Sequence, residues 1–368
     1  MTPPIQIMIV DDSVVIRRIL AKLLSRDPDL AVIGTAANGR IAVDQIPQMK
    51  PDVIILDLEM PELDGFGVLE FLRKNHPGIR TIVFSTLSQR GASQTIEALS
   101  LGASDYSTKP SSMVSGTDDA SVAQVSEELI RKIKQLGLHR KGDFGGLPLE
   151  SGGPGPAAAA RGSSGAENRK NRSFKAVAVG ISTGGPEALL KMLPVFSKSF
   201  PVPILIVQHM PPVFTKLLSD RLASSSRIRV VEASEGMKLE AGTAYIAPGN
   251  FHMEVSKERG ENRIRLNQNP QENSCRPSAD VLFRSVAKAF GGQALGVIMT
   301  GMGQDGYRGL KEMKAEGACV LAQDEASSVV WGMPASVVQE GMADQVVPLS
   351  KMGATIEEWI AGAPVAGR

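Results

Sequence analysis

Residues 180–185, GISTGG, place a serine between glycines directly after the apolar run FKAVAV at 174–179. The turn matches G-x-S-x-G, which lifts a nucleophilic serine clear of a sheet. Ser182 is also explained as a helix N-cap ahead of Pro186, and on this motif alone the cap is the favoured interpretation. A phosphate loop is disfavoured because neither GxxxxGK[ST] nor GxGxxG spacing is present. The motif therefore indicates acyl chemistry only if a general base lies nearby.

Histidine, the usual base for such a serine, is scarce in the second half of the chain. After residue 172 only His209 and His252 occur. His209 follows VPILIVQ, an apolar run typical of a buried parallel strand, so we expect it at the same sheet edge as Ser182. His252 lies in APGNFHMEV, a segment typical of a hairpin, and is interpreted as a structural or substrate-side residue.

A third polar residue must orient the imidazole, and five aspartates are available for that role. Asp305 is the strongest candidate, because ALGVIMTGMGQDG at 294–306 is again an apolar strand that enters a glycine-rich turn. Such a turn exposes backbone N–H groups, as an oxyanion site requires, and Met302 lies in its middle. Asp220 and Asp280 lie in helix-like contexts and are expected on the surface.

A second set of polar residues follows the apolar runs of the first 125 residues. Its members are Asp11, Asp12, Asp57, Ser85 or Thr86, and Lys109. Such acids often cap helices, but here they fall at successive strand ends, which meet at one edge of a parallel sheet. Three carboxylates held together repel one another unless a cation neutralises them, and oxygen ligands suit Mg²⁺. A lysine opposite them is suited to a phosphoryl group.

The order of these elements predicts two parallel, doubly wound sheets, one in each half of the chain. In the first half the strand-length runs are 5–10, 31–37, 52–58, 81–86 and 103–110, and a helix at about 119–136 closes the unit. Residues 142–168 are mostly Gly, Pro, Ala and Ser, which predicts a flexible linker. The expected domains are 1–125 and 173–362, with a helix end and the linker at 126–172.

Composition excludes several classes of protein. The chain has 368 residues, a net charge of +1 and two cysteines without CxxC spacing, so neither a disulfide framework nor a zinc site is expected. Neither a signal peptide nor an 18-residue apolar stretch is present, and we expect a cytoplasmic protein without membrane insertion. The second domain has no helix-turn-helix-like pair or basic stripe, which disfavours nucleic-acid binding.

The segments VDDS, LDLEMPELDG and YSTKP resemble the receiver domain of two-component response regulators. The resemblance implies that Asp57 is the phospho-acceptor and that Mg²⁺ is a cofactor of this domain. It also implies that Ser85 is the switch hydroxyl, with Thr86 left open, that Tyr106 is the coupled aromatic residue and that Lys109 binds the phosphoryl group. The implied metal ligands are Asp11, Asp12, Asp57 and the backbone carbonyl of Glu59.

The fragments GISTGG, QHM and TGMGQDG together resemble the chemotaxis protein-glutamate methylesterases of the CheB type. The resemblance spans the chain and implies two three-layer α/β/α domains, an N-terminal receiver and a C-terminal Rossmann-like catalytic domain. It implies Ser182 as nucleophile, His209 as general base and acid, and Asp305 as the orienting carboxylate. Thr183 and the Met302 backbone are the implied oxyanion and substrate contacts.

The expected function is that of a phosphorylation-activated serine esterase that needs no cofactor for hydrolysis. Its implied substrates are glutamate methyl esters, and by side activity glutamines, on methyl-accepting chemotaxis receptors. The implied phosphoryl donor is a chemotaxis histidine kinase, and the chain is expected to be a monomer. The alternative is a receiver-controlled output domain that only binds a partner. The coincidence of Ser182, His209 and Asp305 at strand ends argues against that alternative.

Overall fold

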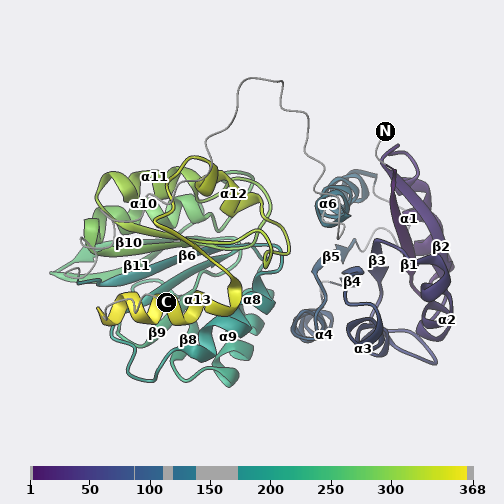
Figure 1. The fold of residues 1–368 in the computed structure, drawn as a ribbon, viewed down its shortest axis with the longest axis horizontal. Coiled ribbons are helices and arrows are strands. Elements are labelled where there is room, and N and C mark those ends of the chain that lie inside the picture. Colours follow the sequence, from purple (N-terminus) through teal and green to yellow (C-terminus); the bar gives the residue numbers. More distant parts are fainter. Residues whose placement is uncertain (1–2, 87, 111–118, 138–172, 363–368) are drawn as a thin grey trace, which may run out of the picture.

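The computed structural model describes residues 3–86, 88–110, 119–137 and 173–362. The linker predicted at 142–168 lies outside these described residues. Two α/β domains are present, and each has helices on both faces of a parallel sheet (Figure 1). The fold class predicted from the sequence is confirmed. In the described part of the chain no helix has the length and apolar character to cross a membrane.

The N-terminal sheet has five parallel strands in the order β2-β1-β3-β4-β5. The strands are β1 (Ile5–Val10), β2 (Leu30–Ala36), β3 (Val53–Leu56), β4 (Arg80–Thr86) and β5 (Asp105–Lys109). The helices are α1 (Val14–Leu24), α2 (Gly39–Met49), α3 (Gly65–Asn75), α4 (Gln89–Ser100) and α6 (Asp119–Gly137). α1 and α6 contribute to one buried cluster, and α2, α3 and α4 to the cluster on the other face. The strands are nearly continuous apolar runs because both faces of the sheet are covered.

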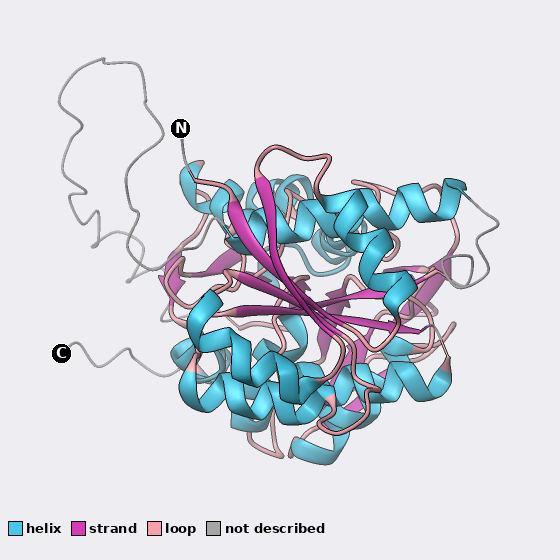
Figure 2. Cartoon of the chain, turned by 90° about the vertical axis from the view of Figure 1, so that its right-hand side faces the viewer, coloured by secondary structure: helices cyan, strands magenta, loops and turns pink. Residues whose placement is uncertain are grey.

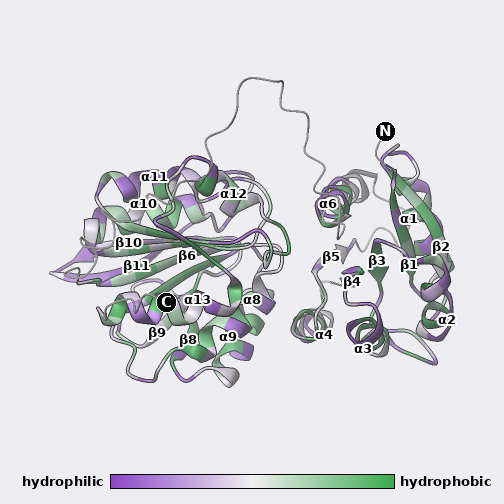
Figure 3. Ribbon diagram, viewed as in Figure 1, coloured by the Kyte–Doolittle hydropathy of each residue, from purple (hydrophilic) through white to green (hydrophobic). Residues whose placement is uncertain are grey.

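The C-terminal sheet has seven parallel strands in the order β14-β13-β12-β6-β7-β9-β8. They are β6 (Ala176–Ile181), β7 (Ile204–Gln208), β8 (Arg229–Glu232), β9 (Thr243–Ile246), β12 (Ala294–Ile298), β13 (Cys319–Gln323) and β14 (Gln345–Val347). Helices α8 (Gly185–Met192), α9 (Phe214–Ser225) and α13 (Leu349–Ala361) cover one face, and α10 (Ala279–Phe290), α11 (Tyr307–Ala315) and α12 (Gly332–Gln339) cover the other (Figure 1). Figure 2 shows the strands between layers of helix, and Figure 3 shows their hydrophobic character.

The strand order of the second sheet determines where a ligand can bind. From β6 the chain adds β7, β8 and β9 on one side and later returns to place β12 on the other side. In open parallel sheets the crevice at such a reversal, beyond the carboxyl ends of the strands, is the usual binding position. An antiparallel hairpin, β10 (His252–Glu258) and β11 (Glu261–Asn267), lies outside the sheet. The hairpin predicted around His252 is therefore present.

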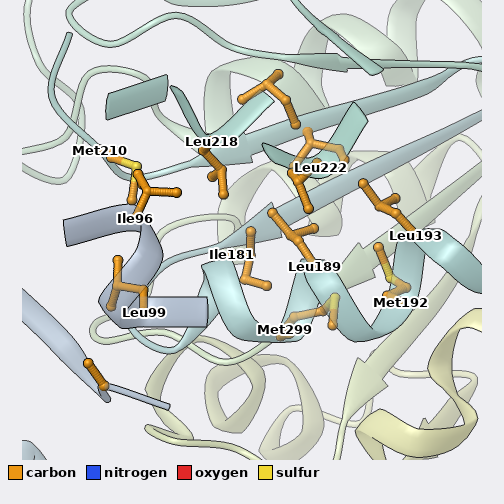
Figure 4. Packing of buried hydrophobic residues seen from close by; sticks show 14 of the residues in the cluster. Ile96, Leu99, Ile181, Leu189, Met192, Leu193, Met210, Leu218, Leu222 and Met299 are labelled. Carbon is orange, nitrogen blue, oxygen red and sulfur yellow. The ribbon is translucent and has the colours of Figure 1, made fainter. Parts of the chain in front are cut away.

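The two domains share one hydrophobic cluster. Ile96 and Leu99 of α4 belong to the same buried cluster as Leu189 of α8 and Leu218 of α9 (Figure 4). Beside them, the ring of Tyr106 on β5 stacks on Phe214, with centroids 5.0 Å apart and planes inclined by 14°. In this conformation the first domain therefore packs against the helices that follow β6 and β7.

Candidate active site

The register of β6 and β7 brings the serine and the histidine to neighbouring positions. Ile181 pairs with Gln208, the last residues of these strands, so Ser182 and His209 are the next residues on adjacent chains. The Ser182 N–H donates to the Thr300 carbonyl at 2.9 Å, which ties the serine to the end of β12 as well. The sheet edge predicted from the sequence therefore carries both residues.

Ser182 is not a helix cap. The N-cap of α8 is Gly184, which has a φ of 78° and makes no side-chain cap hydrogen bond. This left-handed conformation favours glycine, and the turn leaves the serine before the helix. Within the described residues the Ser182 hydroxyl has no hydrogen-bond partner, and the residue is partly exposed. The cap interpretation is wrong, and the hydroxyl is available to a ligand.

His209 is held by Asp305. Its Nε2 lies 2.7 Å from Asp305 Oδ2, and the carboxylate is 2% exposed. Four further groups donate to that carboxylate: the Asn273 amide, the Ser278 hydroxyl and the backbone N–H groups of Ala279 and Asp280. Burial alone raises the pKa of Asp305, but the hydrogen bond from His209 and these donors lower it to about 2. Asp305 is therefore ionised and fixed at the N-terminus of α10, where the helix dipole also favours a negative charge.

Sequence reasoning placed Asp280 on the surface, and that expectation is wrong. Asp280 is 0% exposed and accepts hydrogen bonds from Gly309 N at 2.6 Å and from the Asn273 amide at 2.9 Å. It thereby supports the groups that hold Asp305. Asp220, in contrast, is exposed on α9 as expected.

His252 is a structural histidine. It is 1% exposed, its Nε2 donates to the Pro270 carbonyl at 3.1 Å, and its Nδ1 accepts from Ser278 N at 3.3 Å. Both ring nitrogens are therefore occupied by the segment 270–278, which carries the residues around Asp305. The sequence left two roles open for His252, structural or substrate-side. These contacts support the structural role.

The second ring nitrogen of His209 faces a cysteine that sequence reasoning did not single out. Cys275 Sγ lies 3.7 Å from His209 Nδ1. Burial lowers the pKa of His209, but the hydrogen bond to Asp305 and the contact with Cys275 outweigh it and raise the pKa to about 10. In this conformation the imidazole is therefore protonated at neutral pH.

The oxyanion candidates lie beside the serine. The backbone N–H groups of Thr183 and Met302 donate to no other described residue, so both are available to an anion. Gly301 packs directly on the serine, since a Cβ there would lie 2.8 Å from Ser182 Cβ. The Thr183 hydroxyl is already engaged, because it donates to Asp105 Oδ2 of the N-terminal domain at 2.8 Å.

The N-terminal domain gathers its predicted charged residues at one edge of its sheet. Lys109 Nζ lies 2.8 Å from Asp11 Oδ2 and 2.7 Å from Asp57 Oδ2. Burial raises the pKa of Asp57, and the attraction of Lys109 offsets this only in part. These acids are not helix caps, since Ser13 caps α1 and Asp64 caps α3.

The residues present fit a hard divalent cation. Carboxylate oxygens of Asp11, Asp12 and Asp57 lie within 4.8 Å of one another, and oxygen donors are the ligands that Mg²⁺ prefers. The side chain of Glu59 points elsewhere and pairs with Arg90 at 3.0 Å, which is compatible with a role for its backbone carbonyl alone.

The two candidate switch hydroxyls differ in their surroundings. Ser85 is 6% exposed and its Oγ donates to the Gly91 carbonyl at 3.1 Å. Thr86 is exposed, and its hydroxyl pairs with that of Ser88 at 3.1 Å. Burial at the sheet edge that carries Asp57 favours Ser85, which stays a prediction. Tyr106 lies on the stack with Phe214, at the contact between the domains.

Comparison with known proteins gives the family. The model of the response regulator receiver domain matches residues 7–118, and that of the CheB methylesterase matches 177–356. A protein-glutamate methylesterase/protein-glutamine glutaminase of Trichodesmium erythraeum is 46% identical over 354 residues, covering 96% of this chain and 98% of the relative. The chain belongs to the CheB family of protein-glutamate methylesterases.

Other members of the CheB family agree with this assignment. A relative of the same name from a Nocardioides strain is 43% identical over 357 residues, covering 96% of this chain and 95% of the relative. The crystal structure of the Thermotoga maritima CheB methylesterase catalytic domain is 42% identical, with a TM-score of 0.50, and covers 50% of this chain and 98% of that one. The regions matched by the two family models fall within the domain limits predicted from the sequence, which stay predictions.

Proposed function

We propose that this chain is a phosphorylation-activated serine esterase that hydrolyses glutamate methyl esters on methyl-accepting chemotaxis receptors and deamidates glutamines there. The observation that carries the proposal is the unpartnered hydroxyl of Ser182 beside a histidine that a buried carboxylate holds. The two relatives described above are named for both activities, protein-glutamate methylesterase and protein-glutamine glutaminase. The receptor substrate implies that the reaction takes place on the cytoplasmic side.

The geometry supports ordinary acyl-transfer chemistry with assigned roles. Ser182 Oγ attacks the ester carbonyl. The neutral form of His209, which is the minor form at neutral pH in this conformation, accepts its proton on Nδ1, because Nε2 is engaged by Asp305. The tetrahedral oxyanion faces the free N–H groups of Thr183 and Met302. The intermediate collapses as His209 returns the proton to the leaving methoxide, which departs as methanol. Water then attacks the acyl-enzyme with the same base and releases the glutamate, whereas a glutamine substrate releases ammonia first.

The receiver controls this site through β5. Asp57 accepts the phosphoryl group from a chemotaxis histidine kinase. Asp11, Asp12, Asp57 and the Glu59 carbonyl would hold Mg²⁺, which would supply positive charge to neutralise the phosphoryl oxygens. Lys109, which now pairs with Asp11 and Asp57, gains a more strongly charged partner. Lys109 is the last residue of the strand that starts with Asp105 and Tyr106, both of which contact the catalytic domain.

The unphosphorylated conformation is the inhibited one in this proposal. Met302 and Val329 pack against a buried cluster that contains Val330 together with Leu129 and Ile133 of α6. The segment that provides the oxyanion N–H of Met302 therefore packs against a cluster that includes receiver residues. In this proposal a receptor helix displaces the receiver in order to dock around Ser182. Because the receiver and the catalytic domain belong to one chain, the receiver is present at its contact at an effective concentration of roughly millimolar. Even a weak contact therefore suffices to inhibit the esterase.

Methanol release from methylated receptor, together with labelling by a fluorophosphonate, tests the function. The wild-type chain is expected to release methanol and to be labelled on Ser182, and Ser182→Ala is expected to lose both. Ser173→Ala is the matched control, because Ser173 is an exposed serine just before β6. A chain that binds receptor but neither releases methanol nor reacts with the probe would support the partner-binding alternative instead.

A further inference from the structure

The thiol of Cys275 lies in the active site without a role in ester hydrolysis. Cys275 is partly exposed, and its backbone is fixed by two hydrogen bonds with Glu272, of 2.9 Å and 3.2 Å. This bridge holds Sγ at 3.7 Å from His209 Nδ1, the nitrogen that the proposed mechanism needs as a base. The two atoms are within hydrogen-bonding distance of each other, and a cysteine sulfur and an imidazole nitrogen are also ligand types that Zn²⁺ accepts.

The distance fits one tetrahedral ion between the two side chains. With Zn–S of about 2.3 Å and Zn–N of about 2.0–2.1 Å, two ligands at the tetrahedral angle lie roughly 3.6 Å apart. The observed 3.7 Å therefore matches the separation of two ligands on one ion. Zn²⁺ accepts both ligand types, whereas Mg²⁺ prefers the oxygen-only cluster of the receiver.

Asp305 completes the arrangement as a support for the histidine. A metal-bound histidine almost always donates its other ring N–H to a carboxylate, which fixes the tautomer. Here Nε2 faces Asp305 Oδ2 at 2.7 Å, so Nδ1 is directed to the cysteine. The carboxylate oxygens lie within 4.8 Å of the other two donors, but five groups already bond to them, so Asp305 positions His209 and water completes the coordination.

We infer that Cys275 and His209 form an inhibitory binding site for a thiophilic divalent cation, with Zn²⁺ as the best fit. Binding replaces the thiol proton and the proton on Nδ1 of the imidazolium, so up to two protons leave for each ion bound. The ion then occupies the lone pair with which His209 accepts the proton of Ser182. The inhibition rests on the proposed role of His209 as base, whereas the binding site itself does not.

Zinc titration of the metal-free full-length chain tests the site, with calorimetry for affinity and X-ray absorption for ligands. We expect one sulfur ligand on the bound ion and an affinity at least about tenfold weaker in both Cys275→Ser and Cys275→Ala. The matched control is Cys319→Ala, because Cys319 is the only other cysteine and is buried in β13. This control is expected to keep the wild-type zinc affinity.

Esterase assays with and without Zn²⁺ provide the second readout, each variant being compared with its own metal-free rate. Inhibition of the wild type should be reversed by EDTA and should require at least tenfold more Zn²⁺ in the Cys275 variants. Equal affinity and equal inhibition in wild type and Cys275→Ala, or coordination without sulfur, would overturn the site. Sulfur-coordinated zinc that leaves hydrolysis unchanged would overturn inhibition and contradict His209 as the base. If Ser182→Ala loses activity but the wild-type chain binds no zinc, the esterase proposal stands and only the metal site is refuted.

Discussion

Asp105→Asn is expected to raise the basal esterase activity of the unphosphorylated chain. Asp105 is 5% exposed, and its Oδ2 accepts the Thr183 hydroxyl at 2.8 Å across the domain contact. A hydrogen bond to a charged group contributes about 1.5–3 kcal/mol and a neutral one about 0.5–1.5 kcal/mol, so the amide weakens the contact by roughly 1–1.5 kcal/mol. Because about 1.4 kcal/mol is tenfold, the ratio of open to closed chains rises about 5- to 13-fold.

The substitution also removes the ion pair between Asp105 and Lys132 at 3.5 Å, which lies within the receiver. Lys132 keeps Glu128 at 2.8 Å and the Tyr106 carbonyl at 2.6 Å, so no buried charge loses all its partners. Methanol release measures kcat/KM, and residues 173–362 alone give the upper limit. Asp44→Asn, which makes the same charge change at an exposed position of α2, is the control. A basal rate of Asp105→Asn equal to that of Asp44→Asn, with a faster catalytic fragment, would show that this hydrogen bond does not hold the domains closed.

The remaining predictions concern the catalytic residues and the phospho-acceptor. Ser182→Ala is expected to lower kcat on the order of 10⁶-fold without a change in Tm, and a tenth of the activity remaining would refute the nucleophile. Asp305→Asn should cost orders of magnitude in kcat/KM but less than His209→Ala, and equality with wild type would move the orienting role to another acid. Because the pKa of His209 is raised to about 10, the neutral base forms only as the pH rises, so log kcat/KM of the unphosphorylated chain should climb with pH toward that value; a flat profile between pH 6 and 9 would contradict this. Asp57→Ala should abolish stimulation by acetyl phosphate with Mg²⁺ and leave the basal rate unchanged, whereas a stimulated variant would exclude Asp57 as the acceptor.

The strands and the strand-end residues were predictable because they depend on local pattern. The sequences VIIL of β3 and ILIVQ of β7 are continuous apolar runs, which are typical of strands covered on both faces. The carboxyl ends of parallel strands lie at one edge of the sheet. The positions of Ser182 and His209 follow from that rule. Asp305 follows from the glycine-rich turn after β12. These residues needed no knowledge of distant contacts.

The groups around Asp305 were not predictable in the same way. Asn273, Ser278 and Asp280 reach the carboxylate from a loop and a helix start that lie 25 to 32 residues earlier in the chain. Asp280 was expected at the surface because charged residues on helices usually face solvent. The Asp280 carboxylate is buried because it accepts hydrogen bonds from a backbone N–H group and a side-chain amide. Sequence periodicity does not indicate such contacts. The position of Cys275 beside His209 likewise depends on a contact between residues 66 positions apart in the chain.

The contact between the domains joins apolar residues of the receiver to the helices that follow Ser182 and His209. Ile96 and Leu99 are buried apolar residues of α4, and they pack with residues of α8 and α9. α8 starts three residues after Ser182, and α9 starts five residues after His209. A receiver that shifts α4 and β5 therefore acts on the elements that follow both reactive residues. Under the proposed function, a phosphoryl group on Asp57 therefore needs no direct contact with Ser182 to control it, since the domains that carry the two residues share a packed interface.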